Sequence, residues 1–217
     1  MVKTLLISCL LLALLPPVAS LICDTCWNRG DLCENPTDAF CNSYSNQSCM
    51  SALGESSIFG LKTPFVFKSC MNADICNGGY SSVSISSSLY AHSNILCYES
   101  DLCDRFEPPK MPVREKREPN GLKCPSCISL SSLDCVAENT VDCINEEDQC
   151  FYSAAYIDYV DDCQSRETHL MAAIRGCATS NTCDYVKGLR EADLYYVGIM
   201  ITEAECTKAM DDNANEL

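Results

Sequence analysis

The chain opens with an apolar segment that is followed by small residues. Leu5 to Leu15 are almost all apolar, Lys3 precedes them, and Val18-Ala19-Ser20 follows. This order is typical of a secretory signal peptide with its cleavage site. About 11 apolar residues are too few to cross a bilayer, which takes roughly 20. We therefore expect residues 1–20 to be removed, with a retained membrane anchor as the alternative.

Later apolar positions come in short runs that favour β-strands. Pro64–Phe67, Val83–Ser86 and Leu194–Val197 are rich in β-forming residues, and the second run alternates in polarity. Apolar residues nowhere recur at a helical spacing over a long stretch, so no long helix is expected. Turns are expected at the glycines Gly54, Gly60, Gly78 and Gly79.

A ladder of eight cysteines occurs twice, and matching rungs are offset by 101, 101, 102, 102, 101, 107, 107 and 109 positions. Such self-similarity indicates two copies of one structural unit. The first copy comprises Cys23, Cys26, Cys33, Cys41, Cys49, Cys70, Cys76 and Cys97. The second comprises Cys124, Cys127, Cys135, Cys143, Cys150, Cys177, Cys183 and Cys206.

Cysteine usage indicates an oxidising compartment. The chain has 19 cysteines, and loss of Cys9 with the signal peptide leaves an even number. Each unit is too small to bury a large apolar core, so disulfides must supply stability, at about 2–4 kcal/mol each. We predict a small, disulfide-rich, all-β fold in a secreted protein, with one module at residues 21–103 and a second at 121–217.

Residues 104–120 have the composition of an exposed linker, with four prolines and alternating charges. Within them Arg114-Glu115-Lys116-Arg117 matches the basic pattern of furin-like processing proteases. Cleavage after Arg117 is one interpretation, and a solvated basic spacer is the other.

The charge of the chain excludes some partners. The formal net charge is −15, and residues 121–217 carry 6 basic against 18 acidic residues, a net of −12. An acidic surface repels nucleic acid and anionic lipid. It can attract a basic protein partner or serve solubility alone. No hydrophobic tail suited to a lipid anchor ends the chain, so no membrane anchor is expected.

The ladder spacing resembles the three-finger superfamily of snake toxins and the urokinase receptor. Three strings narrow the resemblance to the gamma-type phospholipase A2 inhibitors, which are secreted two-module proteins without enzymatic activity that often form multi-subunit assemblies. The strings are Pro119-Asn120-Gly121-Leu122-Lys123-Cys124-Pro125, Arg175-Gly176-Cys177 and Glu205-Cys206-Thr207-Lys208-Ala209. The resemblance implies two tandem three-finger modules and a homo- or hetero-oligomer.

The resemblance also implies which cysteines pair, whereas the sequence alone allows many connectivities. In the first module the implied bonds are Cys23–Cys49, Cys26–Cys33, Cys41–Cys70 and Cys76–Cys97. In the second they are Cys124–Cys150, Cys127–Cys135, Cys143–Cys177 and Cys183–Cys206.

Two cysteines remain unassigned because the chain departs from the family pattern. Tyr98 stands where the family has the second cysteine of a tandem pair, which leaves Cys103 without its usual partner. The second module has Asp211 near the place of its final cysteine, and Cys163 is an addition. We hypothesise that Cys103 and Cys163 join the modules or the subunits.

No pattern points to catalysis, a metal or another cofactor. His92 and His169 stand outside any recognisable triad or metal motif. The acidic groups Asp161-Asp162 and Glu146-Glu147-Asp148 do not combine the alternating oxygens and turn glycine of a calcium loop. The C-x2-C pairs fit disulfides better than zinc in a secreted chain. Asn46-Gln47-Ser48 is a glycosylation sequon, expected to be used.

We expect a secreted binding protein, and the resemblance favours an inhibitor that covers the lipid-facing surface of a secreted phospholipase A2. Ile58, Phe59 and Leu61 at the tip of the central finger could bind this partner or another extracellular protein, or pack against the second module. The alternative is a secreted, pheromone-like signalling protein that is processed after Arg117. A component of a secreted coat is a third, weaker option.

Overall fold

The computed structural model describes residues 21–41, 46–58, 60–74, 76–98, 110, 117–161, 166–191 and 199–211. For residues 158–161, 166–169, 189–191 and 199 it describes the backbone alone. Some predictions fall outside the described residues: the signal peptide, Phe59, Cys103, Arg114, Lys116, Cys163 and the strand at Leu194–Val197.

The first half of the chain forms six antiparallel strands in three hairpins, β1–β2, β3–β4 and β5–β6. Strand β3 also pairs with β6, and β4 with β1, so the hairpins merge into one sheet. The predicted strands Pro64–Phe67 and Val83–Ser86 are confirmed within β4 and β5. The bounds are β1 Leu21–Arg29, β2 Thr37–Cys41, β3 Gln47–Ile58, β4 Leu61–Asn72, β5 Gly79–Ser86 and β6 Leu89–Tyr98.

The second half repeats this plan with one replacement. Hairpins β7–β8 and β9–β10 correspond to the first two fingers, and a helix followed by β11 takes the third position. Strand β7 begins two residues inside the predicted linker. The bounds are β7 Pro119–Ser129, β8 Asn139–Ile144, β9 Gln149–Asp161, β10 Arg166–Ala178, α2 Ser180–Glu191, β11 Ile199–Lys208 and β12 Met210–Asp211. The prediction of an all-β, disulfide-rich fold is confirmed.

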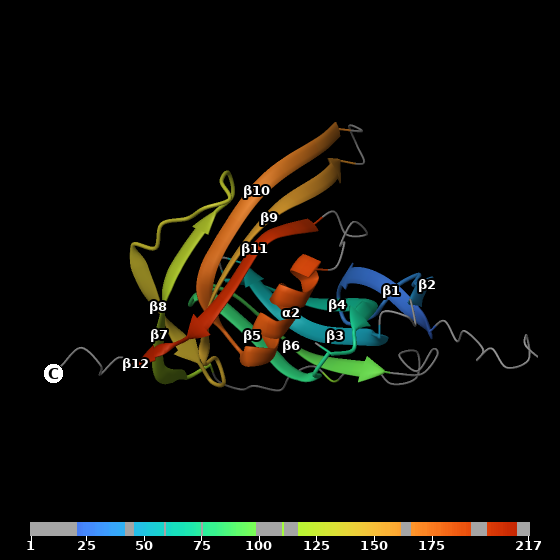
Figure 1. The fold of residues 1–217 in the computed structure, drawn as a ribbon, viewed down its shortest axis with the longest axis horizontal. Coiled ribbons are helices and arrows are strands. Elements are labelled where there is room, and N and C mark those ends of the chain that lie inside the picture. Colours follow the sequence, from blue (N-terminus) through green and yellow to red (C-terminus); the bar gives the residue numbers. More distant parts are fainter. Residues whose placement is uncertain are drawn as a thin grey trace, which may run out of the picture.

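The two halves, called module 1 (β1–β6) and module 2 (β7–β12 with α2) below, share one sheet. Strand β10 pairs with β5 through Cys177–Ser84 and Ala178–Val83, which joins the strands into the order β11-β9-β10-β5-β6-β3-β4-β1-β2. The β9–β10 hairpin stands away from the rest of the molecule (Figure 1). The modules are therefore connected by backbone hydrogen bonds as well as by the linker.

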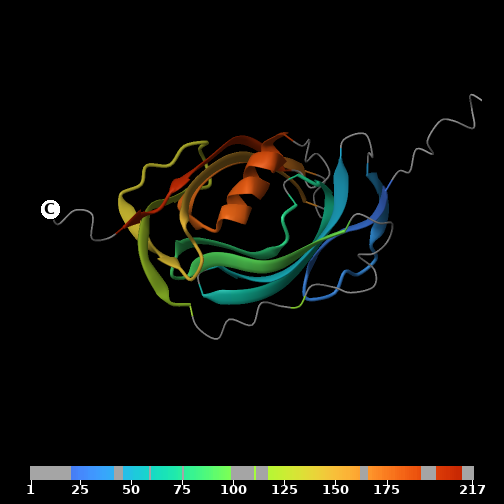
Figure 2. The same ribbon diagram turned by 60° about the horizontal axis from the view of Figure 1, so that its bottom comes forward.

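Helix α2 corrects the expectation that no long helix is present. Cys183 and Tyr185 are both buried, and they lie about 200° apart around a helix of 3.6 residues per turn. Cys183 is bonded to β11 of module 2, whereas Tyr185 packs into the core of module 1 against Met50, Ala52 and Ile95. The helix lies inside the curve of the sheet (Figure 2). A helix buried on opposite sides has no single apolar stripe, which is why the sequence pattern missed it.

Gly54 is a second correction. It lies inside strand β3 rather than at a turn, and a Cβ atom there would strike the carbonyl oxygen of His92 and the Phe65 ring. Gly60, Gly78 and Gly79 have positive φ angles, as their predicted turns require. Gly54 is therefore needed for the close approach of strands and side chains, not for a left-handed backbone.

Gly176 provides the closest test of the module junction. A Cβ atom at this position would fall against the backbone of Ser84 and Ile85, closer than real Cβ atoms come. We expect Gly176→Ala to lower the free energy of unfolding by about 1–3 kcal/mol, because the modules must separate to admit the methyl group. Urea denaturation with the disulfides intact measures this. Unchanged stability would mean that the two modules do not meet there.

Candidate functional site

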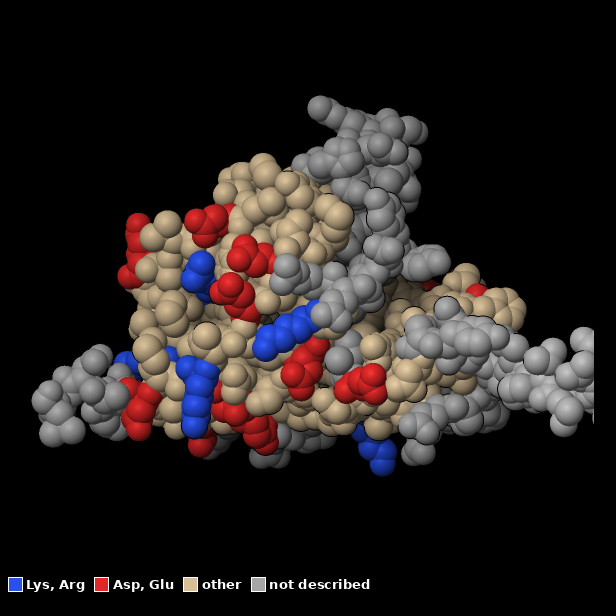
Figure 3. Space-filling view, viewed as in Figure 1, with Lys and Arg blue, Asp and Glu red and all other residues tan. Residues whose placement is uncertain are grey.

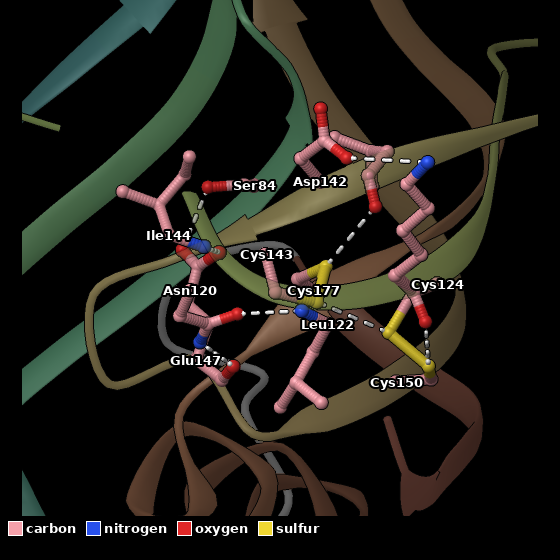
Figure 4. Close-up of a disulfide and its surroundings, with 12 residues drawn as sticks. Ser84, Asn120, Leu122, Cys124, Asp142, Cys143, Ile144, Glu147, Cys150 and Cys177 are labelled. Atoms are coloured by element: carbon pink, nitrogen blue, oxygen red, sulfur yellow. Dashed lines mark hydrogen bonds and ion pairs between the residues drawn. A yellow bond between two sulfur atoms is a disulfide. The ribbon is translucent and has the colours of Figure 1, made fainter. Parts of the chain in front are cut away.

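The bases of both modules are held by disulfides, and the pairing is the one that the resemblance implies. Figure 4 shows two of them, Cys124–Cys150 and Cys143–Cys177. Sulfur atoms also cluster around Cys23, Cys41 and Cys70, but all are in disulfides, and a metal requires thiolates. The eight bonds are Cys23–Cys49, Cys26–Cys33, Cys41–Cys70, Cys76–Cys97, Cys124–Cys150, Cys127–Cys135, Cys143–Cys177 and Cys183–Cys206.

A completely buried carboxyl group, Glu147, connects the modules. Its Oε1 accepts hydrogen bonds from the hydroxyls of Ser82 and Ser84 in module 1, both 2.6 Å long. Its Oε2 accepts from the backbone N–H of Ile144, 2.9 Å away in module 2. Figure 4 shows the side chain between Ser84 and Ile144. Each carboxyl oxygen thus satisfies buried donors that would otherwise lack an acceptor.

Other polar contacts surround this connection. Thr179 donates its N–H to the Ser82 carbonyl and accepts the Ser82 N–H on its hydroxyl. Asn181 in α2 donates to the carbonyl of Tyr80, and Ser126 to that of Ile85. The two modules are consequently fixed in one relative orientation, so a partner can bind residues of both at once.

The stability of the chain should depend on the protonation of Glu147. Burial raises the pKa of its carboxyl above the ordinary 4.5, although the bonds from Ser82, Ser84 and Ile144 and the charge of Arg117 oppose the shift. Between 4.5 and the raised pKa the folded state keeps a proton that the unfolded state has lost. The contribution of this group to stability is therefore largest below pH 4.5 and decreases as pH rises through this window.

Glu147→Gln removes this titration, so the difference in unfolding free energy between wild type and variant should change across the window and level off above it. Urea denaturation from pH 4 to 8 (a range set by roughly ordinary carboxyl and perturbed values) measures this difference. A constant difference would show that the group does not titrate there.

Arg117, predicted as the cleavage position, is held at the junction. Its Nη2 donates to Ser84 Oγ at 2.6 Å, and its guanidinium lies 3.4 Å from the centroid of the Tyr90 ring. Asn94 binds the carbonyl of Lys110, so the predicted linker also contacts β6. A protease that accepts Arg117 must first pull it from these contacts. Cleavage there stays a prediction.

An apolar strip, defined as Trp27, Ile58, Leu61 and Phe65, lies on one face of module 1. Cross-strand partners share a face of a sheet, and the register places Trp27 opposite Phe67, Phe65 opposite Gly54 and Ile58 opposite Leu61. Trp27 stacks on Phe65, with ring centroids 5.5 Å apart. Trp27, Ile58 and Leu61 are 60%, 56% and 73% exposed.

The strip continues the core that α2 covers. Trp27 also meets the edge of Phe67, which packs against the cluster containing Tyr185. Helix α2 thus covers the base of this face, and the strip extends beyond it toward the finger tip. Ile58 and Leu61 are exposed rather than packed against module 2. Trp27 and Phe65 escaped the sequence analysis, although an unpaired signal existed: Trp27 is the single tryptophan.

The remaining chemical candidates do not come together. His92 stacks on Tyr90 and lies near Tyr80 in an aromatic row, and only the backbone of His169 is described. In the acidic run, Glu147 points inward whereas Asp148 accepts from Ser180, so their oxygens do not converge. Acidic side chains are spread over the face in Figure 3 with few basic ones among them. Within the described residues, no helix has the length and apolarity to cross a membrane.

Asn46 is exposed, and its side-chain nitrogen lies 2.9 Å from Asp74 Oδ1. A glycosylated asparagine keeps one N–H, so a glycan and this hydrogen bond are compatible. We predict that protein from a eukaryotic secretory host loses mass on glycosidase treatment and that Asn46→Gln abolishes the loss, as intact-mass spectrometry would show. An identical mass before and after treatment would contradict glycosylation.

Comparison with known proteins agrees with the geometry. Residues 21–105 match the family model "Phospholipase A2 inhibitor", and residues 120–209 match the "u-PAR/Ly-6 domain". The chain is a two-module, u-PAR-like protein similar to the phospholipase A2 inhibitors. The three-finger prediction is thereby confirmed for its domain type.

Individual relatives extend over most of the chain. Phospholipase A2 inhibitor NAI of Notechis ater is 28% identical over 83% of this chain and 85% of its own. A gamma-type phospholipase A2 inhibitor of Gloydius brevicaudus siniticus is 28% identical over 94% and 96%. The solved structure of mouse TEX101 is 17% identical, covering 86% of this chain and 98% of that one, with a TM-score of 0.32, too low to support a structural comparison.

Proposed function

We propose that this chain is a secreted, non-enzymatic protein that binds a secreted phospholipase A2 and inhibits it by covering its lipid-facing surface. The similarity over nearly the whole chain to proteins named phospholipase A2 inhibitors carries the proposal. The eight disulfides are consistent with an extracellular location.

The apolar strip is the contact surface that we propose. An enzyme face that binds lipid is apolar, and an exposed aromatic patch with aliphatic neighbours is the surface on module 1 that complements it. Trp27 and Phe65 form a stacked pair within 5.5 Å, so they are already ordered before binding. Little side-chain freedom is lost when a partner covers such a pair.

The test uses the mature chain from Leu21, with its oxidised mass confirmed first. It is titrated into secreted phospholipase A2 enzymes of several groups, with direct binding measured in parallel. Two substrates are used: phospholipid vesicles and a monomeric short-chain phospholipid. Covering the lipid-facing surface should block vesicle hydrolysis more strongly than monomer hydrolysis, and added vesicles should not relieve inhibition by a stoichiometric complex.

Absence of binding to every enzyme would reject the proposal and favour a receptor-directed signal. Inhibition without binding, relieved by more vesicles, would indicate that the chain coats the substrate instead. Equal inhibition of both substrates would place the contact at the catalytic entrance rather than on the lipid-facing surface.

A further inference from the structure

A cavity of about 800 Å³ lies where module 1 meets the first finger of module 2. The turn between β5 and β6 forms one wall, and strands β7 and β8 form the other. Its volume lies within the roughly 300–1,000 Å³ of small-molecule sites. Apolar residues of both modules line it: Ile85, Leu89, Ile128, Val141 and Ile144.

One cation, Arg117, lines this cavity among the residues that the structure describes. Two of its bonding directions are used, by Ser84 Oγ and by the face of Tyr90. Its Nη1 is buried and has no hydrogen-bond partner in the described part of the chain. A buried charged donor without an acceptor is unfavourable, so an oxygen that enters the cavity would be stabilised there.

Nearby carboxylates do not satisfy Nη1. Both oxygens of Glu147 already accept hydrogen bonds from Ser82, Ser84 and Ile144. Asp142, the other acid on the cavity wall, lies 3.8 Å from Lys123 Nζ. These two acids and the net charge of −15 favour a singly charged ligand over a doubly charged phosphate.

We infer that this cavity binds a long-chain fatty acid, with the carboxylate on Arg117 Nη1 and the hydrocarbon chain along the apolar wall. The hydroxyls of Ser86, Ser126 and Thr140 also line the cavity and offer further donors near the carboxylate. This inference is independent of phospholipase inhibition, and no phospholipase is needed to test it.

The test is calorimetric titration of the full mature chain with oleate below its micelle concentration. Methyl oleate serves as the uncharged analogue and dodecyl phosphate as the phosphate analogue. We expect saturable oleate binding, weaker binding of both analogues, and at least tenfold weaker oleate binding by Arg117→Gln. Ile128→Glu, at the 47% exposed rim, should weaken binding similarly through charge repulsion, whereas Val136→Glu, 78% exposed and outside the cavity, should not.

Near-UV circular dichroism checks that Arg117→Gln keeps the native fold; if it does not, Ile128→Glu decides the outcome. Undetectable oleate binding, or equal binding of methyl oleate, would overturn the inference and leave Nη1 solvated by water. Tighter binding of dodecyl phosphate would overturn the carboxylate assignment. Wild-type affinity in Ile128→Glu together with folded Arg117→Gln would place oleate elsewhere.

Discussion

Glu147→Ala should destabilise the chain by about 3–5 kcal/mol, the range for breaking a buried charged hydrogen-bonded group. The substitution leaves the hydroxyls of Ser82 and Ser84 and the N–H of Ile144 without their acceptor. It also opens a void beside a side chain that is completely buried. Urea denaturation with intact disulfides measures the loss.

The location of Glu147 predicts where this damage appears. The three donors belong to both modules, so their loss weakens the junction more than the disulfide-bonded base of either finger set. We expect limited proteolysis of Glu147→Ala to cut first between the modules. Glu147→Gln keeps the volume and one acceptor, and it should lose only about 1–3 kcal/mol because its amide cannot accept from Ile144.

Glu138→Ala is the matched control, because Glu138 is an exposed glutamate of the same module. It should change stability by no more than about 0.5 kcal/mol. If Glu147→Ala behaves like this control, the buried network does not hold the modules together, and the β5–β10 pairing must suffice.

Leu61→Glu should weaken inhibition of a secreted phospholipase A2 by about 30-fold, the equivalent of ~2 kcal/mol at a binding hot spot. Leu61 is 73% exposed, so the glutamate costs the fold little while it brings a charge into the proposed apolar contact. Trp27→Ala should have an effect of the same order, because it removes the stacked ring and frees Phe65. Titration of each variant against vesicle hydrolysis measures both effects.

Val136→Glu is the control for this surface. Val136 is also exposed and apolar, at 78%, but it lies on the first finger of module 2. It should inhibit like wild type. The opposite pattern, with full inhibition by Leu61→Glu and loss in Val136→Glu, would move the contact to module 2 and reject the apolar strip.

Much of the fold could be predicted from local features of the chain. The repeated cysteine spacing indicated two like modules, and the runs at Pro64–Phe67 and Val83–Ser86 indicated strands, because the alternation of side chains across a strand is visible in one sequence. Helix α2 could not be predicted in this way. Cys183 and Tyr185 are buried by different modules, so the reason for their burial lies outside the helix.

The candidate binding surface was predicted in part for a similar reason. Ile58 and Leu61 stand out because they flank the tip of the central finger, a position that the cysteine register places. Trp27 lies more than 30 positions from them, and its stacking on Phe65 depends on the β1–β4 register. No local pattern contains that register.

Sequence alone indicated the secretory character and determined the acidic balance, the two-module plan and the all-β class, because each follows from composition or from spacing along the chain. Tertiary structure alone revealed how the modules meet. Glu147 reads as one member of an acidic surface run, yet it is completely buried, and Arg117 reads as a linker residue, yet it lies against Tyr90. Both roles depend on Ser82, Ser84 and Tyr90 of the other module, and contacts so distant in sequence form only when the chain is folded.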